Sequence, residues 1–288
     1  MMMRAPPAWR SLLFVPGDRP DRYAKAVASG ADCACIDLED AVAPSAKTEA
    51  RAHALTFVRE GERGEAALAL RVNAVGSDEG RADLAALAEV DRAPDALVLP
   101  KVGSAEDVQT AREALASRHP GTVLVPLVET AEGLLHAVEI ARAQGVAAVL
   151  FGGLDLSADL GAALTWDALL YARSRVVHAT ALAGVAAIDG PFPDIHDLVG
   201  LGRESSRARA LGFTAKAAIH PGQIPSIHDA MVPTEAELSW AHRVLAAADQ
   251  ADGGVSVVNG RMVDAPVVRA AQRTLARAGS PQPRSTSA

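Results

Sequence analysis

Aromatic residues make up only 3% of this 288-residue sequence, although 49% of its residues are hydrophobic. The core must therefore consist of Ala, Val and Leu, small side chains that suit helices packed closely on a sheet. So high a hydrophobic fraction excludes disorder for most of the chain. The length is within range of a single α/β barrel, which commonly needs about 250 residues.

Cysteine is almost absent. Cys33 and Cys35 are too few for a disulfide framework. A zinc site is not indicated either, because C-x-C lacks a second ligand pair and the eight histidines show neither H-x-x-x-H nor H-E-x-x-H spacing. Both cysteines alternate with Ala34 in an apolar run, which favours small strand residues without a chemical role.

Several other features are missing, and each absence excludes a class of function. The net charge of −7 disfavours nucleic acid as a main partner. No stretch approaches the ~20 apolar residues of a membrane span, and the apolar run Leu12–Val15 is too short for a signal-peptide core. Neither G-x-x-x-x-G-K nor a strand followed by G-x-G-x-x-G occurs, so nucleotide hydrolysis and dinucleotide redox chemistry have no support. We expect a cytoplasmic protein with no membrane or nucleic-acid partner.

Short apolar runs alternate with longer segments of helical periodicity along most of the chain. Segments such as 104–117, 130–144 and 194–211 place apolar residues three and four positions apart, as amphipathic helices do. Strict alternation implies parallel strands joined by right-handed crossovers, and eight such units predict a (β/α)₈ barrel of the α/β class. A doubly wound open sheet would show similar periodicity and is the alternative. The eight predicted strands are Ser11–Val15, Cys33–Leu38, Ala67–Val72, Ala96–Leu99, Val123–Val128, Val146–Phe151, Val185–Ile188 and Thr214–Ile219.

The pattern changes after the eighth run. Residues 234–251 predict a helix, residues 255–263 a hairpin and residues 266–278 a final helix. The hairpin turn is Asn259-Gly260, a pair that suits a type I′ turn because both positions need positive φ. We therefore assign residues 10–222 to the barrel, 223–278 to a C-terminal lid or oligomerisation appendage, and 279–288 to a disordered tail.

Two carboxylates follow adjacent predicted strands. In a parallel barrel the reactive side chains come from the carboxyl ends of the strands and the loops after them. Glu129 follows the fifth run and Asp155 the sixth, and adjacent strands lie about 4.8 Å apart, so both side chains can reach one cation. Two carboxylates with waters and substrate oxygens form a common Mg²⁺ site. Alternatively, each acid stabilises the start of the next helix.

Other charged residues are expected at the same rim. Arg71 lies in an otherwise apolar strand, and its guanidinium fork suits a carboxylate or a developing enolate beside a metal, although a structural ion pair is the alternative. Glu39 and Asp40 follow the second run, where they can bind metal waters or position other groups, or one of them can cap the next helix. Asp189 and Lys216, from the last two runs, are expected at this rim as well.

These segments resemble the HpcH/HpaI aldolase and citrate lyase β-subunit family. The resemblance runs in register from about Arg10 to Ala278, nearly the whole chain. The motifs that carry it are Leu13-Phe-Val-Pro-Gly-Asp-Arg19, Ile36-Asp-Leu-Glu-Asp-Ala-Val42, Leu99-Pro-Lys101, Leu127-Val-Glu-Thr130, Phe151-Gly-Gly-Leu-Asp-Leu156, Ala218-Ile-His-Pro221 and Gly260-Arg-Met-Val-Asp-Ala-Pro266.

The resemblance implies residue roles as well as a barrel that binds Mg²⁺ and forms trimers or hexamers. By position, Glu129 and Asp155 would be metal ligands, and Arg71 would bind substrate and stabilise an enolate. Asp264 would be the acid/base on a lid over the neighbouring subunit's site, or it would only cap the last helix. Substrate binding would also involve Glu39, together with Arg19 and Lys47 at the CoA or phosphate side.

The implied activity is Mg²⁺-dependent carbon–carbon cleavage of hydroxyacyl-CoA thioesters of the malyl-CoA, citramalyl-CoA or citryl-CoA type. The products would be a 2-oxo acid and an acyl-CoA, formed through a thioester enolate. Alternatives are a malyl-CoA-type thioesterase, a CoA-independent aldolase of 2-oxo acids, and a β subunit that works in a citrate lyase complex with an acyl-carrier partner.

Overall fold

The computed structural model describes residues 7–62, 64–250 and 255–278. The chain divides into two compact units, of which the first ends at His228 and the second starts at Asp229. Among the described residues, no helix is long and apolar enough to cross a membrane. The predicted tail, residues 279–288, lies outside the described residues.

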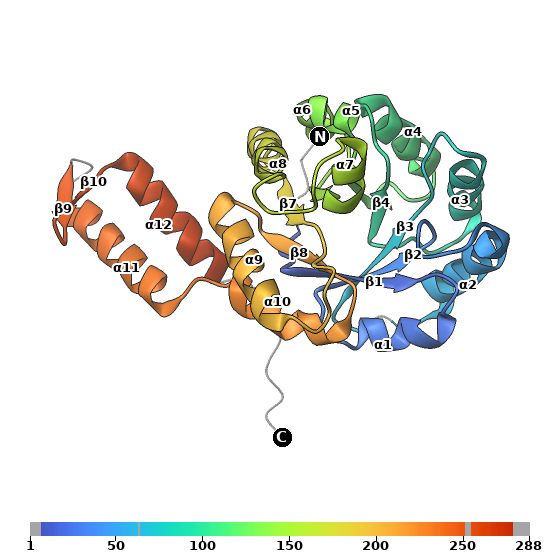
Figure 1. Ribbon diagram of the computed structural model, residues 1–288, viewed down its shortest axis with the longest axis horizontal. Coiled ribbons are helices and arrows are strands. Elements are labelled where there is room, and N and C mark those ends of the chain that lie inside the picture. The colour runs from blue at the N-terminus through green and yellow to red at the C-terminus, as the bar shows by residue number, and fades with distance from the viewer. Residues whose placement is uncertain (1–6, 63, 251–254, 279–288) are drawn as a thin grey trace, which may run out of the picture. The chain divides into compact units, whose positions relative to one another are not determined.

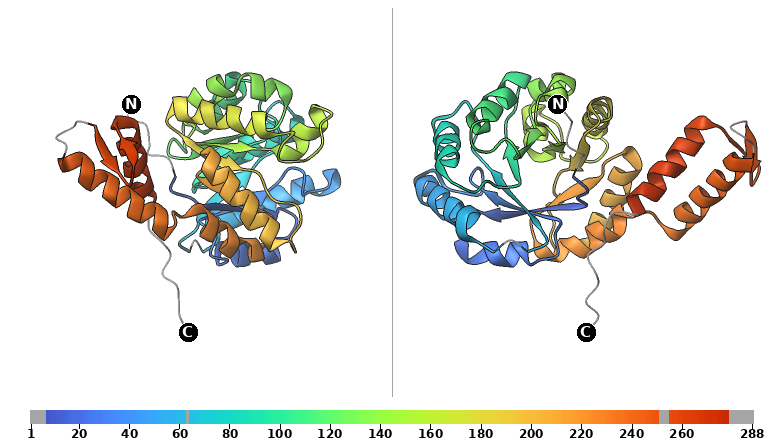
Figure 2. Two further views of the ribbon diagram at one scale, coloured as in Figure 1. Left: turned by 60° about the vertical axis from the view of Figure 1, so that its left-hand side comes forward. Right: turned by 180° about the vertical axis from the view of Figure 1, so that it is seen from behind.

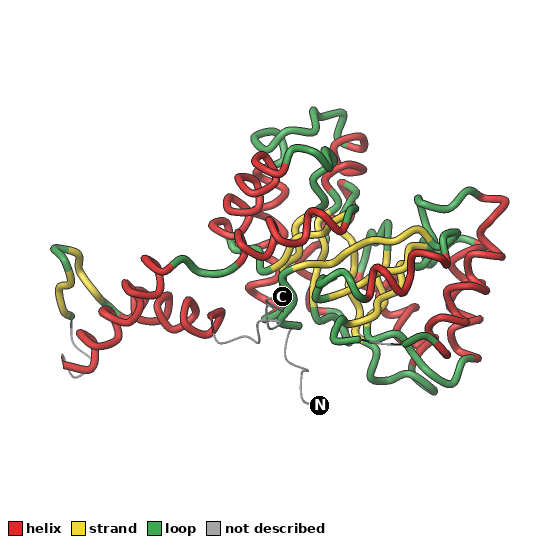
Figure 3. The backbone as a smooth tube through the Cα atoms, turned by 90° about the horizontal axis from the view of Figure 1, so that it is seen from below, coloured by secondary structure: helices red, strands yellow, loops and turns green. Residues whose placement is uncertain are grey.

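The first unit is a closed parallel barrel in which the strands follow one another in chain order. Strands β1 and β8 close the ring, with Leu12 opposite Ala217. In Figures 1 and 3 the strands lie inside a ring of helices. The predicted (β/α)₈ barrel is confirmed, and the open-sheet alternative is wrong. The strands are β1 Ser11–Pro16, β2 Cys33–Asp37, β3 Ala67–Arg71, β4 Ala96–Leu99, β5 Val123–Val128, β6 Ala148–Phe151, β7 Ala186–Asp189 and β8 Ala215–Ala218.

Helices connect the strands, and polar side chains begin several of them. Thr130, for example, accepts the backbone N–H of Gly133 at the start of α5. The helix predicted over 130–144 is interrupted at His136, which separates α5 from α6. The helices that begin in this unit are α1 Tyr23–Val27, α2 Lys47–Glu60, α3 Asp78–Glu89, α4 Ala105–Leu115, α5 Ala131–Leu135, α6 Ala137–Arg142, α7 Gly153–Asp159, α8 Leu170–Ala183, α9 Leu198–Leu211 and α10 Ile224–Met231, with 3₁₀ turns η1 Pro20–Arg22, η2 Pro44–Ala46 and η3 Pro221–Gln223.

The barrel interior is filled by alternate residues of its strands. Most of these side chains are small, such as Ala69, Ala96 and Ala215, as the shortage of aromatics predicts. Cys33 and Cys35 belong to this cluster and are free, buried thiols. Because strand side chains alternate in direction, the residues between these interior positions point toward the helices.

The second unit consists of α11 Glu235–Gln250, β9 Ser256–Val258, β10 Arg261–Val263 and α12 Ala265–Ala278. The hairpin is present as predicted, and Asn259 and Gly260 have φ of 50° and 74°, as a type I′ turn requires. In Figure 2 the two helices lie side by side. A small core formed by Ala241, Val244, Val263 and Ala271 holds the unit together.

Candidate active site

Arg71 ends β3 directly opposite Asp37 of β2. Its Nε and Nη2 donate to the two carboxylate oxygens of Asp37 at 2.7 and 2.6 Å, and Nη1 lies 3.0 Å from Oε2 of Glu39. The guanidinium also lies 4.9 Å from the ring centroid of Phe14. This planar, two-bond pairing fixes the orientation of the arginine at the carboxyl end of the barrel.

Asp37 is not among the predicted site residues, although the alternation of side chains along its strand indicates that it faces the barrel interior. It continues the alternation of the interior residues Cys33 and Cys35 to the end of β2, and it lies opposite Arg71. Besides binding Arg71, its carboxylate accepts the backbone N–H groups of Glu39 and Ala41 at 2.9 and 3.3 Å. Asp37 therefore orients both the arginine and the loop that follows β2.

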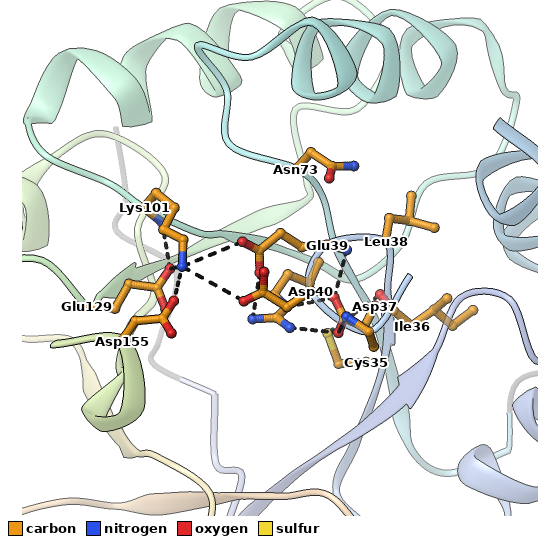
Figure 4. Close-up of polar contacts among 12 residues, drawn as sticks. Cys35, Ile36, Asp37, Leu38, Glu39, Asp40, Asn73, Lys101, Glu129 and Asp155 are labelled. Atoms are coloured by element: carbon orange, nitrogen blue, oxygen red, sulfur yellow. Dashed lines mark hydrogen bonds and ion pairs between the residues drawn. The ribbon is translucent and has the colours of Figure 1, made fainter. Parts of the chain in front are cut away.

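Lys101, which follows β4, brings four carboxylates together. Its backbone N–H donates to Oε1 of Glu129 at 2.8 Å, and its Nζ lies 3.6 Å from the same oxygen and contacts Asp155. The ammonium lies 3.7 Å from Oε1 of Glu39 and 3.8 Å from Oδ2 of Asp40. Figure 4 shows the ammonium between these side chains. Lys101 was not among the predicted site residues either.

Glu129 and Asp155 reach this position from different local structures. Glu129 follows β5, as expected, whereas Asp155 lies in the first turn of α7 and not at the end of β6. Gly152 allows this close approach, because a Cβ there would lie 2.4 Å from the Cβ of Glu129. The two carboxylates point at one nitrogen, so both are within reach of a single cation.

Burial makes it unfavourable for the carboxyl groups of this cluster to carry their charges. It raises the pKa of Glu129, and it raises the pKa of Glu39 to about 7 although Arg71 opposes the shift. Five carboxylates face two basic groups, a set that comprises Asp37, Glu39, Asp40, Glu129 and Asp155 against Arg71 and Lys101.

A divalent cation fits this donor set. Excess negative charge and oxygen-only ligands suit Mg²⁺. Within the described ranges, no three His, Cys, Asp or Glu side chains are arranged to hold a metal by themselves. A cation here would therefore add waters or substrate oxygens to Glu129 and Asp155. A cavity of about 350 Å³, lined by Phe14, Arg71 and both acids among others, provides the space.

Two predicted CoA-side residues contact the protein's own groups. Arg19 is partly exposed, and its Nε and Nη2 donate to Asp21, each at 3.0 Å. Lys47, the first residue of α2, donates to the carbonyl oxygens of Leu38 and Glu39 at 2.9 and 3.0 Å and to Oδ1 of Asn73 at 2.6 Å. Lys47 thus braces the loop that carries the β2 acids.

Asp264 lies in the second unit, just before α12. Its Oδ1 accepts the backbone N–H of Val267 at 3.3 Å, and its carbonyl oxygen accepts the N–H of Val268 at 3.0 Å. The capping arrangement that the sequence offered as an alternative is therefore present.

The prediction that Asp189 and Lys216 join the rim is wrong. Ile188 and Ala217 occupy interior positions, so the neighbouring side chains point outward from the barrel. There the Lys216 ammonium binds Oδ2 of Asp189 at 2.6 Å and Oε1 of Glu204, on α9, at 2.8 Å. These groups form a buried ion-pair network between the barrel and its helices, away from the cavity.

Family models match most of the chain. The HpcH/HpaI aldolase/citrate lyase model matches residues 10–221, and the model for a C–C bond lyase of the TIM-barrel fold matches residues 163–280. Two curated relatives span nearly the whole chain. The mitochondrial citramalyl-CoA lyase of Homo sapiens is 34% identical over 94% of this chain and 86% of its own. The (3S)-malyl-CoA thioesterase of Cereibacter sphaeroides is 35% identical over 94% of both chains.

A solved structure has the same architecture. The crystal structure of the protein CitE from Mycobacterium tuberculosis, in complex with magnesium, acetoacetate and coenzyme A, has a TM-score of 0.81 and 37% sequence identity. It covers 96% of this chain and 98% of its own. With the family model matching residues 10–221, the chain belongs to the HpcH/HpaI aldolase/citrate lyase family.

Proposed function

We propose that this protein is a Mg²⁺-dependent carbon–carbon lyase acting on hydroxyacyl-CoA thioesters of the malyl-CoA, citramalyl-CoA or citryl-CoA type. The observation that carries the proposal is the convergence of Glu129 and Asp155 on one cation position, in a cavity that also holds Arg71. The citramalyl-CoA lyase relative, and the magnesium and coenzyme A bound by the solved neighbour, support it.

Each residue then has a role in cleavage. Glu129 and Asp155 would hold Mg²⁺, which when bound supplies Lewis acidity toward the substrate hydroxyl. The guanidinium of Arg71, fixed by Asp37, would stabilise charge that develops on the thioester oxygen as the carbon–carbon bond breaks. Glu39 would accept hydrogen bonds from bound water or substrate beside the cation. Asp264 of a neighbouring subunit would protonate the enolate carbon, and the proton that the substrate hydroxyl loses as the 2-oxo acid forms would pass to solvent water.

The alternatives would use the same residues. Thioester hydrolysis is favoured by the malyl-CoA thioesterase relative, and it requires only that water attack the thioester carbonyl. A CoA-independent aldolase has less support, because the reported relatives act on or bind CoA compounds. A β subunit within a citrate lyase complex would act on a carrier-bound thioester.

Product analysis separates these activities. We would incubate the purified protein with malyl-CoA, citramalyl-CoA, citryl-CoA and a 2-oxo-4-hydroxy acid, with Mg²⁺ or with EDTA, and measure 2-oxo acids and free thiols. A lyase releases a 2-oxo acid from a CoA ester without free thiol, whereas a thioesterase releases free thiol without 2-oxo acid. Absence of turnover with every CoA ester, or undiminished turnover in EDTA, would contradict the proposal.

We further propose a cytoplasmic homo-oligomer, a trimer or hexamer, in which the second unit covers a neighbour's cavity. Exposed apolar side chains support such contacts. Val257 and Met262, opposite each other in the hairpin, are 69% and 62% exposed, and Leu154 and Ile219 at the cavity are 67% and 44% exposed. A two-stranded hairpin is marginal alone and gains from a surface to pack on. The buried free thiols suit a reducing compartment.

A site shared between subunits predicts complementation. Asp264→Asn and Glu129→Ala should each be inactive, but mixing them under subunit-exchange conditions should restore partial activity, since some sites receive an intact cavity and an intact lid. The measurement is turnover of the identified CoA ester, with exchange verified by mass spectrometry of differently labelled subunits. Confirmed exchange without recovered activity would exclude the shared site.

Arg71→Lys should lower turnover about 100-fold or more, similar to the loss of one donor that stabilises a developing oxyanion. An ammonium cannot bind both oxygens of Asp37 and also face Glu39 in one plane. Turnover of the identified CoA ester and a near-ultraviolet circular dichroism spectrum would be recorded together. Arg59→Lys, at an exposed arginine paired with Glu60, is the matched control. Near-normal turnover of Arg71→Lys would contradict this role.

A further inference from the structure

We propose that Lys101 is the resident cation of the metal-free site. Its ammonium holds the four surrounding carboxylates together until a divalent metal ion displaces it. This inference rests on the proposed function, because it concerns the cation position assigned there to Glu129 and Asp155. The ammonium of Lys101 and the metal ion therefore compete for the same carboxylates.

The first support is the charge around Lys101. Glu39 and Asp40 approach its ammonium from the β2 loop, while Glu129 and Asp155 approach from the opposite side. Like charges held this close repel one another, and the burial of Glu39 and Glu129 strengthens the repulsion. In the metal-free protein, the positive charge at the centre of the four is the ammonium of Lys101, so its removal leaves them to repel.

The second support is the backbone of Lys101. With φ of 53°, it shares the left-handed region with Asn259 alone among the non-glycine residues that the structure describes. That conformation is unfavourable for a lysine and persists only where surrounding contacts impose it. The contact here is the N–H bond to Glu129, so the carboxylate that would bind metal also positions the lysine.

The third support is access to solvent. The side chain of Lys101 is 36% exposed, whereas Lys216, which also binds carboxylates, is fully buried. The ammonium of Lys101 can therefore move into the solvent when a metal ion binds, whereas the ammonium of Lys216 cannot. A flexible four-carbon side chain makes this exchange possible without movement of the backbone.

Two opposite effects of Lys101→Met follow. The metal-free variant should be less stable than wild type, because the four carboxylates lose the cation that they share, although Glu39 keeps its ion pair with Arg71. Mg²⁺ should bind at least about tenfold more tightly, because no ammonium competes. Linkage joins the two effects, since a tenfold change in dissociation constant equals about 1.4 kcal/mol. The stability lost without metal must exceed the stability lost at saturating Mg²⁺ by that same amount.

The experiment combines titration calorimetry of Mg²⁺ with urea unfolding in EDTA and in saturating Mg²⁺. Methionine is unbranched like lysine, so the left-handed backbone at position 101 costs about the same in both proteins. Lys101→Gln is a second variant with a polar side chain. Lys25→Met, at an exposed lysine of α1, is the matched control and should change neither quantity.

The outcomes separate the inference from the proposed function. Tighter Mg²⁺ binding with lower metal-free stability supports the inference, as does Mg²⁺ binding by Lys101→Met where wild type binds none. Unchanged or weaker Mg²⁺ binding by both variants, while wild type binds Mg²⁺, overturns the inference alone. If neither wild type nor variants bind a divalent cation, both the inference and the proposed metal site are wrong.

Discussion

Glu129→Ala and Asp155→Ala should each weaken Mg²⁺ binding by more than about 100-fold. Outer-shell partners of metal ligands are typically worth 10–100-fold in affinity, so a direct ligand should be worth more. The structure brings both carboxylates to one nitrogen atom, and within the described residues no third side chain completes a metal site there. A site with only two protein ligands cannot lose one and keep its affinity.

Titration calorimetry measures this loss directly. Glu132→Ala is the local control, because Glu132 is an exposed acid in the first turn of α5, three residues after Glu129. If Glu129 only stabilised the start of that helix, the two substitutions would have similar effects. Unchanged Mg²⁺ affinity in both Glu129→Ala and Asp155→Ala would exclude the metal assignment.

The barrel could be predicted because its signals are local. Each strand is a short apolar run between helical segments, and Asn259-Gly260 marks the hairpin without any tertiary information. The helix predicted from Asp194 shows the limit. Asp194 accepts the N–H groups of His196 and Asp197 in a turn, and Asp197 instead caps α9, which starts at Leu198. When two aspartates lie this close together in the sequence, the sequence alone does not show which of them is the N-cap of the helix.

The site was predictable where strand order alone decides position. Glu129 and Asp155 follow adjacent strands, so they meet at one rim whatever the details of their loops. The role of Lys101 depends on side-chain reach and on a left-handed backbone, which periodicity does not reveal. Asp189 and Lys216 were misplaced because parallel strands are apolar on both faces, which hides the direction of each side chain.

The outward direction of Lys216 makes it a stability determinant. Lys216 and Asp189 are fully buried, and Arg173 donates to the other oxygen of Asp189 at 2.9 Å. Burial alone would raise the pKa of Asp189, but Lys216 and Arg173 together hold it below its usual value. A carboxylate with a depressed pKa adds stability above its unfolded pKa and loses that stability as the pH falls through its folded pKa.

Lys216→Met should therefore destabilise the barrel by about 3–5 kcal/mol, because breaking a buried ion pair on one side leaves an uncompensated charge. Acid unfolding should begin at a higher pH than in wild type, since the pKa of Asp189 rises when one of its two cations is removed. Urea unfolding at neutral pH and a pH series would measure both effects. Lys25→Met serves as the exposed control.

A double variant tests whether an unpaired Asp189 causes the loss of stability in Lys216→Met. Replacing both partners of a buried pair by apolar residues is often neutral or stabilising, so Lys216→Met/Asp189→Leu should be more stable than Lys216→Met alone. In the double variant Arg173 still faces Glu204, at 3.9 Å, and keeps a carboxylate partner. If the double variant were instead less stable than the single one, lost packing and not an unpaired Asp189 would explain the destabilisation.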